Sequence, residues 1–370
     1  MRILIIHNES AYFSGAERML GYFLEGAART GMEFAVAVVP ESRMAALLPE
    51  HVRPVWIGDN QRFSPLALCR QARALCRHGS QFPYDLVHGW AARDWELASL
   101  VGKLSRRPAI GTLHDHPAAT FISRKRQCLM RWCAAFGLAK VACVSAAVRD
   151  ACAAAGYPDG KLTVIHNGLP PTNFPPSVRS GITCRFGFIG AFSERKGLRG
   201  LFEIADQIEK TTHSAWELHI AGEAQDEAGR QLVSELRARH QSKPWWPRVH
   251  WHGWVGQPQK FLSQLDLLIV PSSGFDPLPT VLLEAGQIGV PVLAARVGGV
   301  AEVIRDGDTG WLFEVGDWMA AANTANRFFL STQALQTVGL RAAENIHRNF
   351  SVADMVKKYC HLYSTLLTHD

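Results

Sequence analysis

Two acidic residues eight positions apart stand out in residues 275–313, which follow the strand-like segment DLLIVPS. Asp276 lies in a proline-rich turn, and Glu284 falls inside a short helix that we expect to begin near Thr280. The first N–H groups of such a helix, including that of Val281, have no acceptor within the helix and can hold an anion. A carboxylate beside them can accept hydrogen bonds from sugar or ribose hydroxyls. The segment therefore predicts a site for an anion that carries hydroxyl groups.

A pair of cations follows an earlier strand. Residues 186–198, FGFIGAFSERKGL, have the pattern of a strand, a turn at Gly190 and a helix, with Arg195 and Lys196 at the helix start. Paired cations just after a strand end neutralise a diphosphate well, because both side chains bind phosphate oxygens. The alternative is a solvated helix start, and the surrounding pattern favours the diphosphate.

Histidines raise the question of a metal. His114 and His116 form a His-x-His pair in LHDHP, at the end of a predicted strand. No third ligand lies at helix or strand spacing, so a metal there is disfavoured. The other thirteen histidines are expected to be surface or packed groups. In WWPRVHWHGW the strand pattern favours Trp251, and Trp254 less strongly, as core residues rather than a stacking platform.

Short apolar runs that alternate with amphipathic helical stretches must position these residues. In the first half the strand candidates are RILIIH, FAVAVV, YDLVHGW, PAIGTL, KVACVS and LTVIHN. After the proline-rich LPPTNFPP they are RFGFIG, ELHIAG, RVHWHGW, DLLIVPS, PVLAAR and TGWLF. Such alternation is typical of parallel sheets covered by helices on both faces. We therefore expect an α/β chain with two sheets, whose strands point their carboxyl ends at a central cleft.

Composition agrees with two domains. The 370 residues are 47% hydrophobic and 19% charged, which excludes a disulfide miniprotein, a coiled coil and a disordered chain. No apolar run is long enough to span a membrane, and the opening MRILIIHNES lacks the apolar length of a signal peptide. The eight cysteines form no CxxC pair, which favours reduced thiols and a cytoplasmic location.

Charge is uneven along the chain. Residues 1–170 carry 20 Lys and Arg against 13 Asp and Glu, whereas residues 171–370 carry 19 against 20. Residues 116–149 contain no acidic residue and interleave basic with apolar and aromatic side chains, Phe121 and Trp132 among them. Attachment to an anionic membrane surface and a solvated face remain equally open, and no nucleic-acid module is found. The chain also lacks the P-loop and any Gly-x-Gly spacing, which argues against a P-loop NTPase and a dinucleotide fingerprint.

Together these motifs resemble family 4 (GT4) retaining glycosyltransferases of the GT-B fold, which have two Rossmann-like parallel-sheet domains facing across a central cleft. The matching segments, in order, are FSGAERML, LHDHP, VIHNGL, FIGAFSERKGL, LHIAGEA, VHWHGWV, the Asp276–Glu284 block and the final SVADMVKKYCHLYSTLL. The resemblance implies an acceptor-binding domain at 1–170 and a nucleotide-sugar-binding domain at 171–350. It implies that a C-terminal helix, 351–370, crosses back to the first domain.

The resemblance also implies site residues. The catalytic positions would be His114, Asp276, Arg195 and Lys196. Positions that bind the nucleotide-sugar would be Gly15, Gly190, Arg195, Lys196, Gly222, Asp276, Thr280, Val281 and Glu284. The two cations would neutralise the leaving diphosphate in place of a metal, so neither metal nor cofactor is expected and the nucleotide-sugar is a co-substrate.

Individual roles follow from the same resemblance. Glu284 would hold ribose hydroxyls, Asp276 the donor sugar, and His114 the sugar near its reacting carbon. Asp276 stands where the family motif has glutamate, which is one methylene longer.

The implied reaction is transfer of a sugar to an acceptor hydroxyl with retention of configuration. The expected acceptor is a glycan or lipid-linked precursor of bacterial surface polysaccharide, reached from the inner face of the cytoplasmic membrane. A nucleotide-sugar epimerase, a sugar phosphorylase and a non-catalytic two-lobed binding protein are the alternatives. The sequence does not specify the sugar, the base or the acceptor.

Overall fold

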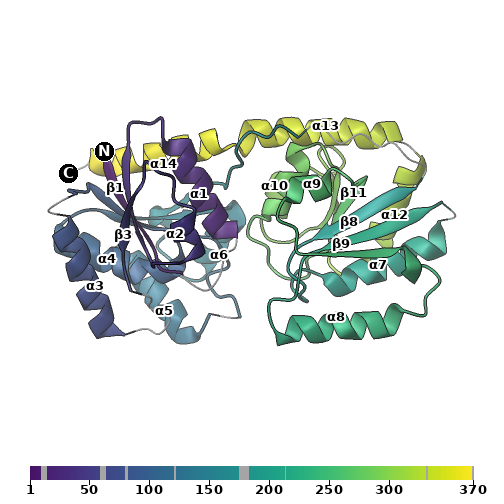
Figure 1. The fold of residues 1–370 in the computed structure, drawn as a ribbon, viewed down its shortest axis with the longest axis horizontal. Helices are drawn as coiled ribbons and strands as arrows, with labels where there is room; N and C mark the ends of the chain where they lie inside the picture. The colour runs from purple at the N-terminus through teal and green to yellow at the C-terminus, as the bar shows by residue number, and fades with distance from the viewer. Residues whose placement is uncertain are drawn as a thin grey trace. The chain divides into compact units, whose positions relative to one another are not determined.

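The computed structural model describes residues 1–9, 15–58, 64–79, 82–120, 122–174, 183–212, 214–330 and 332–368. It divides into two compact units, of which the first combines Met1–Pro170 with Ser351–Asp370 and the second is Pro171–Phe350. Each unit is a parallel sheet covered by helices (Figure 1). This architecture confirms the predicted α/β class with two parallel sheets. No described helix is both long and apolar enough to cross a bilayer.

The first sheet has the strand order β3-β2-β1-β4-β5-β6-β7. Its strands are β1 (Arg2–His7), β2 (Glu33–Val38), β3 (Arg53–Trp56), β4 (Leu86–Gly89), β5 (Ala109–Leu113), β6 (Lys140–Cys143) and β7 (Leu162–Val164). The helices of this unit are α1 (Gly15–Ala27), α2 (Arg43–Ala46), α3 (Pro65–His78), α4 (Trp95–Ser105), α5 (Arg124–Trp132), α6 (Ala146–Ala154) and α14 (Val352–Leu367). Short helical turns lie at η1 (Ala92–Asp94), η2 (Cys133–Gly137) and η3 (Asp159–Lys161).

Of these strands, β3 is the one that the sequence analysis did not predict. It is a four-residue edge strand that contains Pro54, and Val55 is its single buried residue. A proline is tolerated at a sheet edge, where no second neighbour needs its missing N–H. Without an apolar run, such a strand has no periodic signal.

The last helix completes the first unit. In Figure 1 α14 (yellow) lies beside α1 (purple). The hydroxyl of Tyr363 hydrogen-bonds Nδ1 of His88 at 2.8 Å, and the hydroxyl of Tyr359 hydrogen-bonds Oγ1 of Thr112 at 2.9 Å. All four side chains are buried. Leu169 accepts a hydrogen bond from the N–H of Val352 at 2.9 Å, which ties the start of α14 to this unit.

The second sheet has the order β10-β9-β8-β11-β12-β13. Its strands are β8 (Cys184–Ile189), β9 (Trp216–Ala221), β10 (Val249–Gly253), β11 (Leu267–Val270), β12 (Val292–Ala295) and β13 (Trp311–Phe313). Its helices are α7 (Leu198–Thr211), α8 (Glu227–His240), α9 (Pro258–Leu262), α10 (Thr280–Gln287), α11 (Val300–Val303), α12 (Trp318–Leu330) and α13 (Thr332–Asn349), with a short turn at η4 (Trp246–Arg248).

Opposite faces of the second sheet are covered by different helices. Phe186 and Phe188 of β8 join α7, α8 and α12 in one aromatic-rich core. Gly187, which points the other way, would place a Cβ 2.1 Å from Leu265, in the segment between α9 and β11. A side chain larger than hydrogen at Gly187 would therefore displace the α9 side of the sheet.

Candidate functional site

Each sheet reverses its direction of growth at one point. In the second unit β8 starts in the middle, the chain adds β9 and β10 on one side, and β11 to β13 then follow on the other. Open α/β sheets bind ligands beyond the carboxyl ends of their strands at such a reversal. Arg195 and Lys196 follow β8 and Asp276 follows β11, so the predicted cation pair and carboxylate flank this point.

Lys196 and Asp276 form a direct ion pair. The Nζ of Lys196 lies 2.7 Å from Oδ2 of Asp276, and the side chains are 24% and 4% exposed. The hydroxyl of Ser272 donates to the same oxygen at 3.1 Å. Burying a carboxylate is costly unless it is paired and hydrogen-bonded, and these two contacts supply both conditions.

Arg195 holds the neighbouring loop through its backbone. Its carbonyl accepts hydrogen bonds from the N–H groups of Ser273 and Gly274, at 3.0 and 3.2 Å. Its guanidinium donates to the carbonyl of Phe275 at 3.4 Å and the residue is exposed. The cation is therefore placed beside the Asp276 turn without being neutralised by a carboxylate among the contacts in the described part of the chain.

Glycines let the strand ends approach one another. The φ of Gly222, just after β9, is +129°, and a Cβ there would lie 1.9 Å from the carbonyl oxygen of Gly190. The N–H of Gly190 donates to the carbonyl of Ala221, which links the ends of β8 and β9. A Cβ at Gly197, whose φ is +76°, would lie 1.7 Å from the carbonyl oxygen of Pro271. These close approaches keep the cation-bearing turn next to the strand ends.

The start of α10 has the geometry expected for anion binding. Pro279 precedes Thr280, and no side chain caps this helix end. The N–H of Leu282 donates to the carbonyl of Pro279 at 3.1 Å, so this third N–H of the helix is occupied. Glu284 follows one turn later and is 3% exposed. This helix therefore places a buried carboxylate behind its N-terminus.

The first sheet has its own reversal, between β1 and β4. His7 at the end of β1 lies between two buried carboxylates, with Nε2 3.4 Å from Oε1 of Glu17 and Nδ1 3.8 Å from Oδ2 of Asp94. Burial favours the neutral ring, but Asp94, Glu17 and Glu9 together raise the pKa of His7 above its ordinary value. Asp94 also accepts hydrogen bonds from the N–H groups of Asn8 and Ala91, both at 2.8 Å.

Sequence reasoning did not identify this group of His7, Glu17 and Asp94. A histidine at the carboxyl end of the first strand was the available signal, but its acidic partners come from segments 10 and 87 positions away. Of the predicted Gly15 turn, residues 10–14 lie outside the described residues, and Gly15 is the first residue of α1.

His114 follows β5, next to this group. Its Nε2 donates to the carbonyl of Trp90 at 3.0 Å, so Nδ1 is the nitrogen that can accept a hydrogen bond. Burial lowers the pKa of His114 to about 4. Neighbouring His116 uses its Nδ1 to accept from the N–H of Ala118, so the two histidines serve separate local contacts.

The described residues of the basic segment, 116–149, form several short elements rather than one helix. The segment runs through α5, η2, β6 and the start of α6. Arg126 pairs with Glu96, and Lys140 donates to the carbonyl of Gly160. Arg124 and Lys125 are exposed, whereas the predicted Phe121 lies outside the described residues. Its positive charge is therefore partly committed to contacts within the unit.

Three apolar side chains nevertheless remain exposed near α5. Leu104, Trp132 and Phe136 are 54%, 51% and 66% exposed. The rings of Trp132 and Phe136 lie 5.9 Å apart, and Nζ of Lys103 lies 5.6 Å from the Trp132 ring centroid. Apolar side chains beside cations are the combination that a membrane surface binds.

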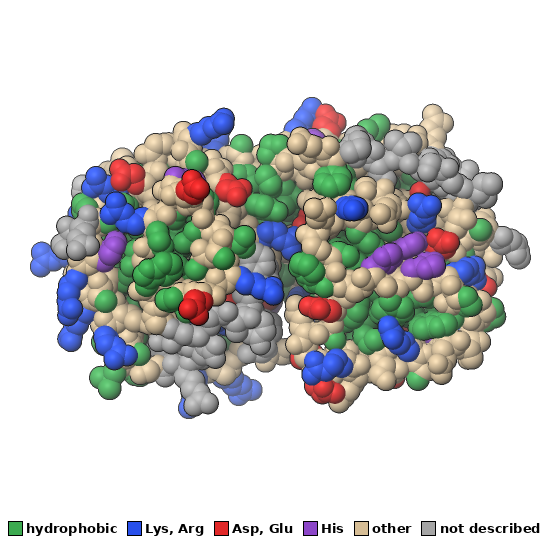
Figure 2. Space-filling view, viewed as in Figure 1, with side chains coloured by type: hydrophobic (Ala, Val, Ile, Leu, Met, Phe, Trp, Pro, Cys, Tyr) green, Lys and Arg blue, Asp and Glu red, His purple; other side chains and the backbone are tan. Residues whose placement is uncertain are grey.

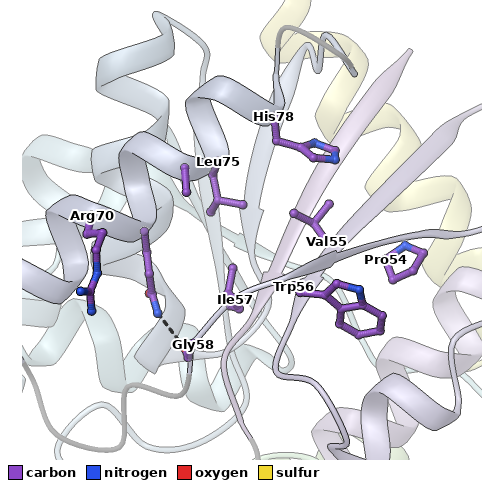
Figure 3. Close-up of a pocket in the computed structure, with 10 residues that line it drawn as sticks. Pro54, Val55, Trp56, Ile57, Gly58, Arg70, Leu75 and His78 are labelled. Carbon is purple, nitrogen blue, oxygen red and sulfur yellow. Dashed lines mark hydrogen bonds between the residues drawn. The ribbon is translucent and has the colours of Figure 1, made fainter.

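A pocket of about 500 Å³ lies between β3 and α3 (Figure 3). Val55, Ile57 and Leu75 line it, and Gln71 donates to the carbonyl of Gly58 at 2.7 Å. Since β3 is an edge strand, this pocket lies two strands from the reversal between β1 and β4. It contains none of the predicted site residues.

One further residue corrects the sequence analysis. Trp254, a weaker core candidate, is 66% exposed, whereas Trp251 packs on the core and stacks on Phe202. Asp306 and Asp308 form an acidic pair with one residue between them, which the sequence analysis did not name. Such spacing can chelate a cation, but Asp306 accepts from the N–H of Leu312 and Asp308 pairs with arginines.

Two family models match the chain in succession. The model described as Glycosyltransferase Family 4 matches residues 13–173, and the model described as Glycosyl transferases group 1 matches residues 183–344.

Curated relatives match over shorter stretches. N-acetyl-alpha-D-glucosaminyl L-malate synthase of Bacillus anthracis is 38% identical over 109 residues, 30% of this chain and 28% of that protein. The lipopolysaccharide core biosynthesis glycosyltransferase LpsE of Rhizobium meliloti is 25% identical over 178 residues, 48% of each protein. The chain therefore spans less than half the length of these two relatives.

Solved structures match over nearly the whole chain. Anabaena Alr3699/HepE, in complex with UDP and glucose, has a TM-score of 0.82 at 21% identity, covering 98% of this chain and 99% of that one. The apo form of WaaB, a lipopolysaccharide outer core galactosyltransferase, has a TM-score of 0.78 at 19% identity, covering 99% and 100%. The two parallel sheets and these neighbours define the GT-B fold. The chain belongs to the family 4 glycosyltransferases, which confirms the predicted fold and family.

The contrasting histidine environments predict opposite pKa shifts. We expect the pKa of His7 to lie above that of an ordinary histidine and His114 to stay neutral down to pH 5, as measured by NMR of ¹⁵N-labelled histidine. The unfolded chain binds a proton at His114 near pH 6.5 and the folded chain only near pH 4. The free energy of unfolding should therefore fall as the pH drops from 6.5 to 4.

His114→Gln should flatten this slope, because glutamine can still donate to the Trp90 carbonyl but does not titrate. The raised pKa of His7 changes stability above pH 6.5, outside this window, and His7 is present in both proteins, so the difference between them isolates His114. His361→Gln, an exposed change on α14, is the matched control. An unchanged slope in His114→Gln would show that His114 is protonated normally.

Proposed function

We propose that this chain transfers a sugar from a nucleoside diphosphate sugar to an acceptor hydroxyl, with retention of configuration and without a metal. The observation that carries the proposal is the Lys196–Asp276 pair, with Arg195 beside it, at the reversal point of the second sheet. A diphosphate requires a cation, and a sugar hydroxyl requires an acceptor such as a carboxylate. Support also comes from HepE, a neighbour of the same fold solved with UDP and with UDP-glucose.

In the proposed mechanism, positively charged groups stabilise the leaving diphosphate. Bond cleavage leaves a diphosphate with developing negative charge, and Arg195 and Lys196 stabilise that charge in place of a metal. Lys196 has three N–H donors, so it can keep one on Asp276 while it turns the others to phosphate oxygens. The free N–H groups of Thr280 and Val281 at the start of α10 add further phosphate donors.

The carboxylates select the hydroxyl-bearing parts of the donor. Both described contacts of Asp276 use Oδ2, and we assign its carboxylate to the donor sugar. Glu284, behind the helix N-terminus, is assigned to the ribose. Asp276 is shorter than glutamate, and its backbone is fixed because its carbonyl accepts from the N–H of Gly299 at 2.9 Å. A fixed backbone lets a short side chain hold its oxygen in place.

The first unit is assigned to the acceptor. His114 keeps its assignment to the donor sugar near the reacting carbon, and its Nδ1 can accept a hydrogen bond from a hydroxyl of that sugar. The named functions of the relatives, lipopolysaccharide core, colanic acid and amylovoran biosynthesis, favour a glycan or lipid-linked precursor of bacterial surface polysaccharide. We place the reaction at the inner face of the cytoplasmic membrane.

The function is tested with UDP- and GDP-sugars incubated with glycan acceptors. We expect a glycosylated product and one nucleoside diphosphate for each sugar transferred, and the same rate after exhaustive chelation. An epimerised donor without a glycosylated product would indicate an epimerase, and binding without turnover a binding protein. Loss of turnover that magnesium or manganese restores would contradict the cation-based leaving-group mechanism.

Removing either cation should slow transfer sharply. Charge-assisted contacts contribute about 1.5–3 kcal/mol, and more where charge develops on a leaving group. We expect Arg195→Ala and Lys196→Ala each to lower turnover at least about a hundredfold.

Arg199→Ala is the matched control, since Arg199 pairs with Glu194 and Glu235 at the surface of the same unit. Lys196→Gln, which keeps a donor for Asp276, separates loss of charge from loss of fold, and circular dichroism checks the fold of each variant. Near-normal turnover in both alanine variants would refute the site assignment.

Substitutions of the two carboxylates should have different kinetic effects. We expect Asp276→Asn to impair sugar transfer more than nucleoside diphosphate affinity, because its proposed partner is the sugar. Glu284→Gln should weaken binding of the nucleoside diphosphate itself, because its proposed partner is the ribose. Calorimetric affinities and turnover numbers for both variants test this, and normal transfer by Asp276→Asn would move the sugar-binding role elsewhere.

The exposed surface near α5 should bind anionic lipid. Each Lys or Arg near an anionic leaflet contributes about 1 kcal/mol, so Arg124→Gln with Lys125→Gln should lower vesicle partitioning about thirtyfold at low salt. Lys210→Gln, an exposed change on α7, is the control. The protein should sediment with anionic vesicles at low salt and detach at high salt. Equal sedimentation with neutral vesicles would favour the solvated face.

A further inference from the structure

Four polar side chains gather on one face of the second sheet, at its edge. Glu217 and His219 belong to β9, and His250 and His252 belong to the edge strand β10. His219 and His250 are direct partners in the strand register. Strand side chains alternate between faces, and Leu218 points into the aromatic core. The four polar groups therefore occupy the opposite face, where the ring of His252 contacts α9.

The rings are close enough to interact directly. The rings of His219 and His250 stack with centroids 4.8 Å apart, which is the spacing of neighbouring strands. The Nδ1 of His219 lies 3.0 Å from Nε2 of His252, and its Nε2 lies 3.3 Å from Oε2 of Glu217. Histidine side chains, purple in Figure 2, lie together at the surface of the second unit.

The pKa shifts in this group favour neutral histidine rings, which can bind a metal ion, over positively charged ones. Burial lowers the pKa of His219, and the neighbouring His250 and His252 lower it further, against the opposing effect of Glu217. Burial and His250 lower the pKa of His252 as well. Neutral imidazoles carry a lone pair and are good metal ligands, whereas three adjacent imidazolium ions would repel one another.

We propose that Glu217, His219 and His250 bind one divalent transition-metal ion. Each offers one ligand atom, and the three atoms lie within 4.8 Å of one another. Among the described residues, this is the one group of three His, Cys, Asp or Glu side chains close enough to hold an ion. Bonds of about 2.0–2.2 Å in a tetrahedral site require ligand atoms about 3.3–3.5 Å apart, so side-chain rotations that move these atoms about 1.3 Å suffice. Two nitrogens and one oxygen suit zinc, copper or nickel rather than magnesium or calcium.

His252 acts as the orienting partner. When Nε2 of His219 binds the ion, its proton moves to Nδ1, which then donates to Nε2 of His252. Water completes the coordination, because the site faces solvent. The ion would link the edge strand β10 to β9. At the carboxyl ends of these strands the N–H of Gly222 already donates to the carbonyl of Gly253 at 2.7 Å. None of the ligands belongs to the residues assigned to sugar transfer.

Isothermal titration calorimetry with zinc chloride tests the site, using untagged, chelator-stripped protein. We expect one ion per chain and a higher melting temperature in the presence of zinc. The double variant His219→Ala with His250→Ala should abolish this binding, and Glu217→Gln should weaken it at least about tenfold. His252→Ala should weaken it about tenfold through loss of the orienting contact.

His347→Ala, an exposed change on α13 of the same unit, is the matched control and should bind zinc as the parent chain does. Cobalt substitution adds a spectroscopic readout, because its visible absorption reports coordination number. Absence of binding by the stripped parent protein, or equal binding by the folded double variant, would overturn the proposal. Since the readout is metal binding, it is independent of whether the chain transfers a sugar.

Discussion

The point at which each sheet reverses its growth determines where polar chemistry is placed in this molecule. Both sheets begin in the middle, at β1 and at β8, and then add strands on either side. The loops that leave the two neighbouring strands at the reversal point run in opposite directions. The side chains that follow these strands therefore face an open crevice and are not covered by a crossover connection. His7 and Asp94 lie at one reversal, and Lys196 and Asp276 at the other.

The two reversals hold their charges in different ways. In the second unit one ammonium satisfies one carboxylate, and Arg195 stands beside them without a carboxylate partner among the described contacts, so the region has spare positive charge for an anion. At the reversal point of the first unit one imidazole lies between two carboxylates, so carboxylates outnumber the titratable cation there. The proposed assignment of the donor diphosphate to the second unit and of the acceptor to the first unit follows this difference in charge.

The sequence predicted the elements that have apolar runs and the residues that follow those runs. It therefore located Arg195, Lys196 and Asp276 correctly after their strands, while the edge strand β3 was missed because Pro54 and exposed neighbours leave no pattern. Groups assembled by register or across loops were not predictable: His219 meets His250 only because β9 and β10 pair in one particular alignment. Their functional roles remain proposals.

The return of the last helix has a consequence for synthesis of the chain. His88 and Thr112 lie in the first sheet, yet their buried hydrogen-bond partners Tyr363 and Tyr359 belong to α14, which is synthesised after the whole second unit. The second unit contains its whole sheet within a continuous stretch, Pro171–Phe350, and can form as soon as that stretch is complete. The residues of the first unit before Pro170 are synthesised before the second unit, but this unit is completed after it. Until α14 is synthesised, an apolar face of α1 stays exposed, and a chaperone can recognise it.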